Sequence, residues 1–174
     1  VMKEFGADIL RLWVSSCDYQ FDVRLSKEIL KQLADQYRKI RNTFRYLLAN
    51  LYDFDPEKNS LPFENLHPLD LWAIGHVQKL AQAVDKAYKA FEFHEIYSRV
   101  HQFCSGFLSA YYFDVLKDTL YTAKKDSPLR RSAQTGLFYI LSSLVRAVAP
   151  ILPFTADEVW NSFAIGETCS VHAA

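Results

Sequence analysis

Between Leu30 and Leu51 the apolar residues recur at alternating steps of three and four, and this spacing constrains the fold more than any other feature. The series consists of Leu30, Leu33, Tyr37, Ile40, Phe44, Leu47 and Leu51. Such spacing places all of them on one face of an α-helix, whereas a strand would need strict alternation. Ser26 precedes the series and is expected to be the N-cap of a helix that runs to about Tyr52. A helix this long with one apolar face needs other helices to cover that face.

A second stripe on the same helix is basic. At 100° per residue, Lys27, Lys31, Arg38 and Arg45 fall within about 40° of one another. Arg41 and Asn42 flank this row. We use the name cationic stripe for five residues of the face: Lys31, Arg38, Arg41, Asn42 and Arg45. Glu28 near the helix start and Asp35, expected on the back of the helix, are the few local acids. Two interpretations stay open: a solvated helix face, which most charge runs are, or a surface that binds a polyanion.

Proline-containing breakers separate further helical segments. Helices are expected at about 6–16, from Pro68 to about 91, at 93–119, and from Pro128, with Ser127 as N-cap, to 150. A short helix should follow a capping box formed by Thr155 and Glu158. The expected core faces are Ala73, Val77, Leu80, Val84, Ala87 and Phe91; Ile96, Val100, Phe103 and Phe107; and Leu137, Leu141, Leu144 and Val148. Only residues 19–25 alternate as a strand does, so the sequence predicts an all-α bundle of antiparallel helices.

Composition limits the classes of function. A chain of 174 residues, half of them apolar, can bury the core of one compact domain. Twenty Lys and Arg balance twenty Asp and Glu, so any binding of nucleic acid must be local. The three cysteines, Cys17, Cys104 and Cys169, form no CxxC pair and indicate free thiols in the cytoplasm. Residues 135–154 are apolar but contain Arg146 and two prolines, which favours a buried helix and no membrane span. The chain opens with Val1 and Met2, which suggests a fragment of a longer protein.

Catalytic and metal-ligating groups do not converge in the sequence. Glu64 and His67 have the ExxH spacing of bundle di-iron sites, but there is one copy and Pro68 follows it. His94 and His101 can share a helix face, although such histidines are seldom ligands, and Cys104 reads as a core residue. No phosphate-binding loop or dinucleotide fingerprint is present. We therefore expect no catalytic residues, no metal site and no cofactor in this chain.

Residues 109–131 interleave aromatic and basic side chains. Tyr111, Tyr112, Phe113 and Tyr121 lie near five cations, Lys117, Lys124, Lys125, Arg130 and Arg131. Aromatic planes with nearby cations suit unstacked RNA bases and their phosphates. The alternative is that the tyrosines pack inside the bundle while the cations are solvated in a loop, and the sequence does not decide between the two.

Three stretches carry a resemblance to a known family: "GADILRLWVSSCDYQFDVRLSKEILKQLADQYRKIRNTFRYLLANLYDFDP", "YTAKKDSPLRRSAQT" and "APILPFTADEVW". They resemble isoleucyl-tRNA synthetases of the bacterial type, in the helical segment that follows the catalytic domain. The resemblance covers residues 1–172, and IRNTFRYLL and YTAKKDS separate it from the valyl, leucyl and methionyl enzymes. The family's HIGH and KMSKS signatures, editing domain and C-terminal zinc region do not occur in this chain.

The resemblance implies an anticodon-binding helical bundle at 26–174, truncated at its C-terminus, with residues 1–25 as the connector from a catalytic domain. Its implied partners are the anticodon stem-loop of isoleucine tRNA and that catalytic domain. Residues 6–14 are expected to face the catalytic domain, so their apolar side should be exposed in this chain. The chain is expected to be a cytoplasmic monomer without membrane contact. ATP, magnesium and zinc are implied only for the full-length ligase. Asn42 and Arg45 are the nearest counterparts of the asparagine and arginine that the related methionyl enzyme presents to the anticodon, and Tyr121 lies near the place of its stacking tryptophan. A helical scaffold that binds protein is the alternative function.

Overall fold

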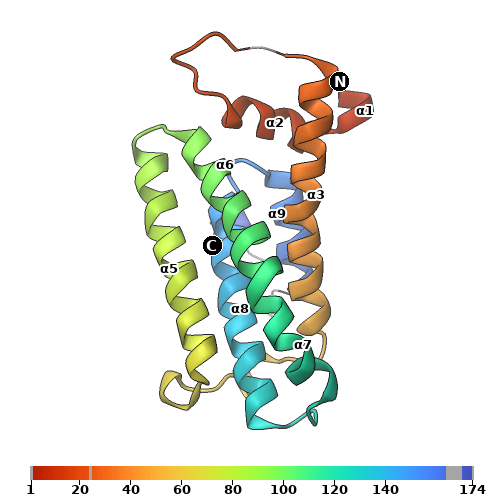
Figure 1. Ribbon diagram of the computed structural model, residues 1–174, viewed down its shortest axis with the longest axis vertical. Helices are drawn as coiled ribbons and strands as arrows, with labels where there is room; N and C mark the ends of the chain where they lie inside the picture. Colours follow the sequence, from red (N-terminus) through yellow and green to blue (C-terminus); the bar gives the residue numbers. More distant parts are fainter. Residues whose placement is uncertain (1, 24, 164–169, 174) are drawn as a thin grey trace.

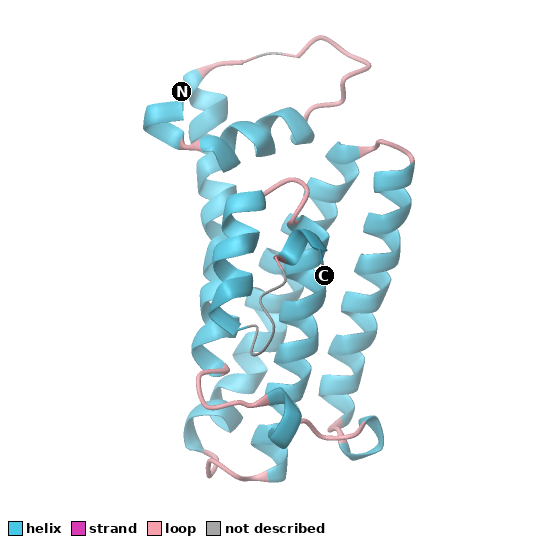
Figure 2. Ribbon diagram, turned by 180° about the vertical axis from the view of Figure 1, so that it is seen from behind, coloured by secondary structure: helices cyan, strands magenta, loops and turns pink. Residues whose placement is uncertain are grey.

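A computed structural model describes residues 2–23, 25–163 and 170–173, and within these ranges the chain is an antiparallel helical bundle without strands (Figures 1 and 2). The elements are α1 (Met2–Phe5), α2 (Ala7–Ser16), α3 (Lys27–Asn50), α4 (Pro56–Asn59), η1 (Phe63–Asn65), α5 (Pro68–Lys89), α6 (Phe93–Gln102), η2 (Phe103–Tyr112), α7 (Phe113–Thr122), α8 (Pro128–Val148), α9 (Pro153–Phe163) and η3 (Val171–Ala173). The predicted all-α class is confirmed.

The long helices alternate in direction. In Figure 1, α3 descends, α5 returns upward, α6 descends through η2 into α7, α8 rises and α9 descends again. The two short helices α1 and α2 lie across the upper end, while the loop after α3 and the turn before α8 meet at the lower end (Figure 1). The basic residues predicted to bind RNA therefore belong to helices whose lower ends lie close together.

None of the helices in the described residues is long and apolar enough to cross a membrane.

Side-chain caps explain the starts of two long helices, whereas Ser127, predicted as the N-cap of α8, precedes that helix without a side-chain capping hydrogen bond. Ser26 caps α3 because its Oγ accepts a hydrogen bond from the backbone N–H of Ile29 at 3.2 Å, as predicted. His67 caps α5 in the same way, since its Nδ1 accepts from the N–H of Leu69 at 3.3 Å. The predicted capping box is wrong, because α9 begins at Pro153 and places Thr155 inside the helix. Thr155 instead donates through its N–H and Oγ1 to Asp8 Oδ2, at 2.8 and 2.5 Å, and so ties α9 to α2.

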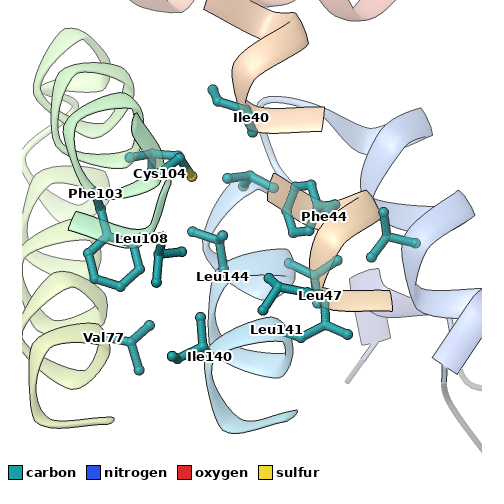
Figure 3. Packing of buried hydrophobic residues seen from close by; sticks show 14 of the residues in the cluster. Ile40, Phe44, Leu47, Val77, Phe103, Cys104, Leu108, Ile140, Leu141 and Leu144 are labelled. Atoms are coloured by element: carbon teal, nitrogen blue, oxygen red, sulfur yellow. The ribbon is translucent and has the colours of Figure 1, made fainter. Parts of the chain in front are cut away.

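The core lies between α3, α5, the η2 segment and α8 (Figure 3). Phe44 and Leu47 from α3 meet Leu141 and Leu144 from α8, and all four are at most 1% exposed. The predicted core of α8, namely Leu137, Leu141, Leu144 and Val148, is confirmed as buried, and so is Cys104. Burial raises the pKa of the Cys104 thiol to about 12, so this cysteine is an inert core residue.

A π-helical segment, η2, explains one error in the predicted core. Seven of the residues buried along this helix, Ile96, Val100, Cys104, Leu108, Tyr112, Leu116 and Leu120, lie at intervals of four, and Phe103, as predicted, and Phe113 are buried beside them. In a regular α-helix a stripe with that period would rotate away from the core, by about 40° for each interval. The wider turns of η2 keep these residues facing inward. Phe107, predicted to face inward on an α-helical period, is consequently only partly buried.

Three other expectations differ from the structure. Residues 19–23 and 25 form turn and loop and not a strand, because no described strand is available to pair with them, and Arg24 lies outside the described residues. Phe91 is 63% exposed, since α5 ends at Lys89 and Phe91 has a left-handed φ of 59°. On α2, Ile9 and Leu12 are buried against the bundle, while Val14 is 61% exposed, so only part of its apolar side is uncovered.

A buried carboxylate fixes α5 against its neighbours. Asp70 is 1% exposed and accepts hydrogen bonds from Tyr112 Oη at 2.7 Å and Ser132 Oγ at 2.5 Å. Burial raises the pKa of Asp70 even though both hydrogen bonds oppose that shift. A Cβ at Gly136 would stand 2.9 Å from the Tyr112 hydroxyl, so a side chain there would collide with this network. The network sets the register of α5, η2 and α8.

Candidate nucleic-acid interface

The cationic stripe is solvent-exposed along its whole length. Lys31, Arg38, Arg41, Asn42 and Arg45 are all exposed on α3, on the side turned away from the core. Fourteen residues separate the first from the last, so the stripe extends for about 21 Å along the helix. The α3 helix forms one edge of the bundle (Figure 1). The stripe is therefore accessible to a large polyanion.

One member of the stripe has an acidic partner that the sequence interpretation placed elsewhere. Asp35, expected on the back of α3, forms an ion pair with Arg38 through its Oδ1. Both side chains are well exposed, at 70% for Arg38 and 65% for Asp35. An exposed pair of this kind contributes little to stability, and the guanidinium remains able to exchange partners. Within the described residues, Lys31, Arg41 and Arg45 have no acidic side chain within ion-pair distance.

The upper half of the stripe borders a hollow of about 510 Å³ between α3 and the N-terminal helices. Lys31, Arg38 and Arg41 line one side of it, and Glu4 and Phe5 of α1 line the other. The hollow has a mixed polar and apolar lining and places three cations around one opening. This half of the stripe is suited to phosphate groups and offers no aromatic platform beyond Phe5 and Tyr37.

The lower half of the stripe is joined to α7 by Tyr46, a residue that the sequence interpretation did not single out. The ring of Tyr46 stacks on Phe113, with centroids 4.1 Å apart, and its hydroxyl donates to the Phe113 carbonyl at 3.3 Å. Burial raises the pKa of Tyr46, and the nearby Tyr121 hydroxyl and Asp114 carboxylate raise it further. Tyr46, the residue after Arg45, thus joins α3 to the part of α7 that carries Tyr121. The aromatic residue directly after Arg45 was the signal for this contact.

On α7 and the turn after it, four predicted residues are exposed: Lys117, Tyr121, Lys124 and Lys125. Tyr121 is 66% exposed, so one face of its ring is open to a base. Lys117 pairs with Asp114 at 2.7 Å on the same helix, and that carboxylate holds the pKa of Lys117 above its ordinary value. Asn42 and Arg45 on α3 and Lys117 and Tyr121 on α7 are thus exposed on two helices that meet at Tyr46.

Arg130 and Arg131 do not join this surface. Each is 7% exposed, and their guanidinium groups point into the contact between α8 and the loop after α3. Arg130 donates to both carboxylate oxygens of Asp53, at 2.8 and 3.1 Å, while Arg131 donates to the Asp53 carbonyl at 3.1 Å. The prediction that these two arginines bind RNA is corrected accordingly, because their hydrogen-bonding groups are committed to the fold.

Asp53 also accepts from Gln134 Nε2 at 2.7 Å, which completes a buried ionic network at the start of α8. Burial alone would raise the pKa of Asp53. The hydrogen bonds from Arg130 and Gln134, with the charges of both arginines, outweigh burial and hold that pKa below its ordinary value. A buried acid with a lowered pKa is well compensated, so this network stabilises the folded chain when Asp53 is ionised.

The residues considered for metals stay apart. Within the described ranges no three His, Cys, Asp or Glu side chains gather in an arrangement that could hold a metal ion. His67 serves as the cap of α5, and its Nδ1 is already an acceptor. Cys169 lies outside the described residues.

Comparison with protein families decides the class of the bundle. Residues 70–174 match the family model described as the anticodon-binding domain of tRNA ligase. The chain belongs to this family. The matched residues include Lys117, Tyr121, Lys124 and Lys125 of this anticodon-binding domain, whereas the cationic stripe on α3 precedes them.

Relatives of the anticodon-binding domain cover α3 as well. The chain is 51% identical over 173 residues to isoleucine–tRNA ligase of Syntrophotalea carbinolica, covering 99% of this chain and 19% of that protein. It is 50% identical over 172 residues to isoleucine–tRNA ligase 1 of Oceanobacillus iheyensis, with 99% and 19% covered. The identity to isoleucine–tRNA ligase of Geobacter sulfurreducens is 49% over 174 residues, which is all of this chain and 19% of that protein. The chain thus spans about a fifth of the length of these ligases.

Proposed function

We propose that this chain binds the anticodon stem-loop of isoleucine tRNA and serves as the anticodon-binding part of an isoleucine–tRNA ligase. The observation that carries the proposal is that the exposed cationic stripe lies on α3, which meets α7 at Tyr46 close to the exposed Tyr121. Membership of the anticodon-binding family and the ligase relatives support the same assignment.

Different parts of this surface have different tasks in the proposal. Lys31, Arg38 and Arg41 lie about one to four helical turns from the Tyr46 contact and hold phosphates of the stem, which fixes orientation without reading sequence. Asn42 and Arg45 lie at the lower end, where side-chain hydrogen bonds can read the edges of unpaired bases. Tyr121 supplies the plane on which a loop base stacks, with Lys117, Lys124 and Lys125 beside it for the backbone.

The ligase reaction itself would take place elsewhere in a longer polypeptide. This chain has no phosphate-cradling loop, and the buried carboxylates Asp53, Asp70 and Asp8 accept hydrogen bonds from side chains of the fold. ATP and magnesium would act in the catalytic domain, and zinc in a further region. We place the contact with that catalytic domain at α2, where Leu10, Val14, Tyr88 and Phe93 line an apolar hollow of about 390 Å³. The purified chain should therefore catalyse no isoleucine-dependent ATP–pyrophosphate exchange.

Titration of the purified chain with isoleucine tRNA and with a noncognate tRNA, each at a low and a higher salt concentration, tests the proposal. Zero net charge removes long-range attraction, so the affinity should be micromolar or weaker. It should fall with salt by a logarithmic slope of about −0.7 to −0.9 for each phosphate neutralised. Cognate tRNA should bind more tightly at both salt concentrations. Equal, salt-independent binding of both tRNAs would contradict the proposal and favour a scaffold that binds protein.

A further inference from the structure

A groove of about 410 Å³ lies between α5 and the continuous α6–η2 helix. The α6–η2 helix separates it from α3, so the groove is not part of the surface assigned to the anticodon (Figure 1). His76 and Lys79 line it from α5, and Arg99, Phe103, Gly106 and Phe107 line it from the other side. Neither the anticodon surface nor the buried ionic networks use these residues.

The groove and its lower end are unusually rich in aromatic rings. Phe107 stacks on His76 at 4.6 Å between centroids and on Phe103 at 5.2 Å. Trp72 extends this cluster, with centroids 5.0 Å from Phe107 and 5.7 Å from Tyr111. Trp72 is 45% exposed and Tyr111 is 49% exposed. Phe107 is therefore packed between His76 and Phe103, while Trp72 and Tyr111 remain about half exposed to solvent.

The π-helical geometry of η2 produces this arrangement. Because its wide turns hold Cys104 and Leu108 against the core, Phe107 is displaced toward α5 and meets Trp72 and His76. Gly106 adds space, since nothing lies within 4 Å of the position that a Cβ would take there. Extended π-helical segments are rare and are frequent at functional sites.

The charges around the groove favour an anion. Lys79 is exposed at its edge and has no ion-pair partner among the described acidic side chains. Arg99 pairs with Glu95 at 3.0 Å, with both side chains about half exposed. No Asp or Glu lines the groove. A ligand that carries both a flat ring and a negatively charged group would match the aromatic cluster and Lys79.

We propose that this groove, together with the exposed rings of Trp72 and Tyr111 beyond its lining, binds one unstacked nucleotide of single-stranded RNA, with its base against these two rings and its phosphate at Lys79. Flat aromatic platforms with adjacent cations are the usual means by which proteins hold unpaired nucleotides, whereas a protein-docking face is an apolar patch with a polar rim. The groove is a second RNA contact, distinct from the anticodon surface. It rests on the proposed function only for the identity of the RNA that supplies the nucleotide.

A two-dimensional NMR titration with a uridine hexanucleotide tests this inference. The chain has three tryptophans, and Trp72→Phe assigns the indole N–H signal of Trp72. That signal should shift on addition of the RNA. Gly106→Leu should weaken the affinity read from the shift roughly tenfold, because the leucine occupies the groove and prevents stacking. Gln78→Leu is the control, since Gln78 is exposed on α5 but does not line the groove.

Arg45→Glu separates the two proposals because it alters only the anticodon surface. The affinity read from the Trp72 signal should stay within about twofold, since distant sites act independently. Trp72→Leu, followed by the anisotropy of labelled hexanucleotide, should show the same loss as Gly106→Leu and provides a second variant. No shift of the Trp72 signal, or equal effects of Gly106→Leu and Gln78→Leu, would overturn the inference while leaving the anticodon surface untouched. A stronger response to an acidic tyrosine-containing peptide than to RNA would also overturn it, in favour of protein docking.

Discussion

Arg45 and Arg130 show how one residue type serves opposite ends in this bundle. Arg45 lies exposed on α3 without a described acidic partner, next to a tyrosine that leads to α7. Arg130 is 7% exposed in the first turn of α8 and forms a two-point contact with Asp53. The first charge is available to a partner molecule, and the second is consumed by the fold. What distinguishes them is that the loop after α3 brings Asp53 against Arg130, whereas Arg45 receives no such acidic residue from the described part of the chain.

The position of Arg130 within its helix carries a signal that helical periodicity does not. The N-terminus of a helix is the positive end of its dipole, and basic side chains there are unfavourable unless an acid offsets them. The first turn of α8 contains no acid of its own. Asp53, which follows α3, supplies that charge from 77 residues away. Arg45, in the second half of α3, has no such conflict to resolve.

The largest effect should come from Arg130→Ala. Removing one partner of a buried ion pair leaves Asp53 uncompensated and should lower the free energy of unfolding by about 3–5 kcal/mol. Arg45→Ala, an exposed substitution, should change it by less than about 0.5 kcal/mol. Urea denaturation followed by circular dichroism measures both. Equal stabilities of the two variants would remove the distinction between the two arginines.

Acid should act on the Arg130 network and spare the stripe. Asp53 has a folded-state pKa below its ordinary value of 3.8, so its contribution to stability is present above pH 3.8 and is lost as the pH falls below it, through the folded-state pKa. Asp70, with a raised pKa, acts in the opposite sense and gains a proton more readily when folded, so its contribution increases as the pH falls. As the pH is lowered through this range, the urea midpoint of the natural chain should fall. Asp53→Asn should be less stable at neutral pH and flatter in acid; an unchanged slope would contradict the role of Asp53.

Asn42→Ala sharpens the comparison within the stripe itself. If Asn42 reads a base, its loss should cost about 1–3 kcal/mol with isoleucine tRNA and less with a noncognate tRNA. Gln32→Ala, which removes another exposed amide from α3, is the matched control and should leave both affinities unchanged. Filter binding at fixed salt measures the four constants. A uniform loss across both tRNAs would mean that Asn42 contacts only the backbone.

The smallest effect is expected for Asp35→Ala. This change releases Arg38 from an exposed pair that contributes at most about 1 kcal/mol to stability. Since Arg38 then meets phosphate without competition, tRNA affinity should rise slightly and the salt slope should steepen by up to about one phosphate. Glu28→Ala, at the start of the same helix, removes an acid without freeing Arg38 and controls for the change in net charge. Weaker binding by the Asp35 variant would show that Arg38 does not contact the RNA.

Periodicity and capping residues were sufficient to predict the long helices and their inward faces, as the burial of Leu141 and Leu144 shows. They failed where the backbone departs from α-helical geometry. The wide turns of η2 keep residues at intervals of four buried, so Phe107, which an α-helical period places in the core, is only partly buried. The exposure of the stripe followed from the same helical wheel. The burial of Arg130 and Arg131 could not be predicted in this way, since it depends on contacts with Asp53, which lies far away in the sequence. Likewise the link from Arg45 to Tyr121 passes through Tyr46, which only the packing of α3 on α7 discloses.

The central claim is that the exposed cations of α3 contact tRNA phosphates, and the salt dependence of two charge reversals tests it most directly. Arg45→Glu removes a stripe residue, whereas Lys39→Glu makes the same charge change on the flank of α3 near His101 of α6. Both variants alter net charge equally, so long-range effects cancel. The account predicts that Arg45→Glu lowers affinity for isoleucine tRNA and flattens the logarithmic salt slope by about one phosphate, while Lys39→Glu changes both little. Identical affinities and slopes for the two variants would contradict it.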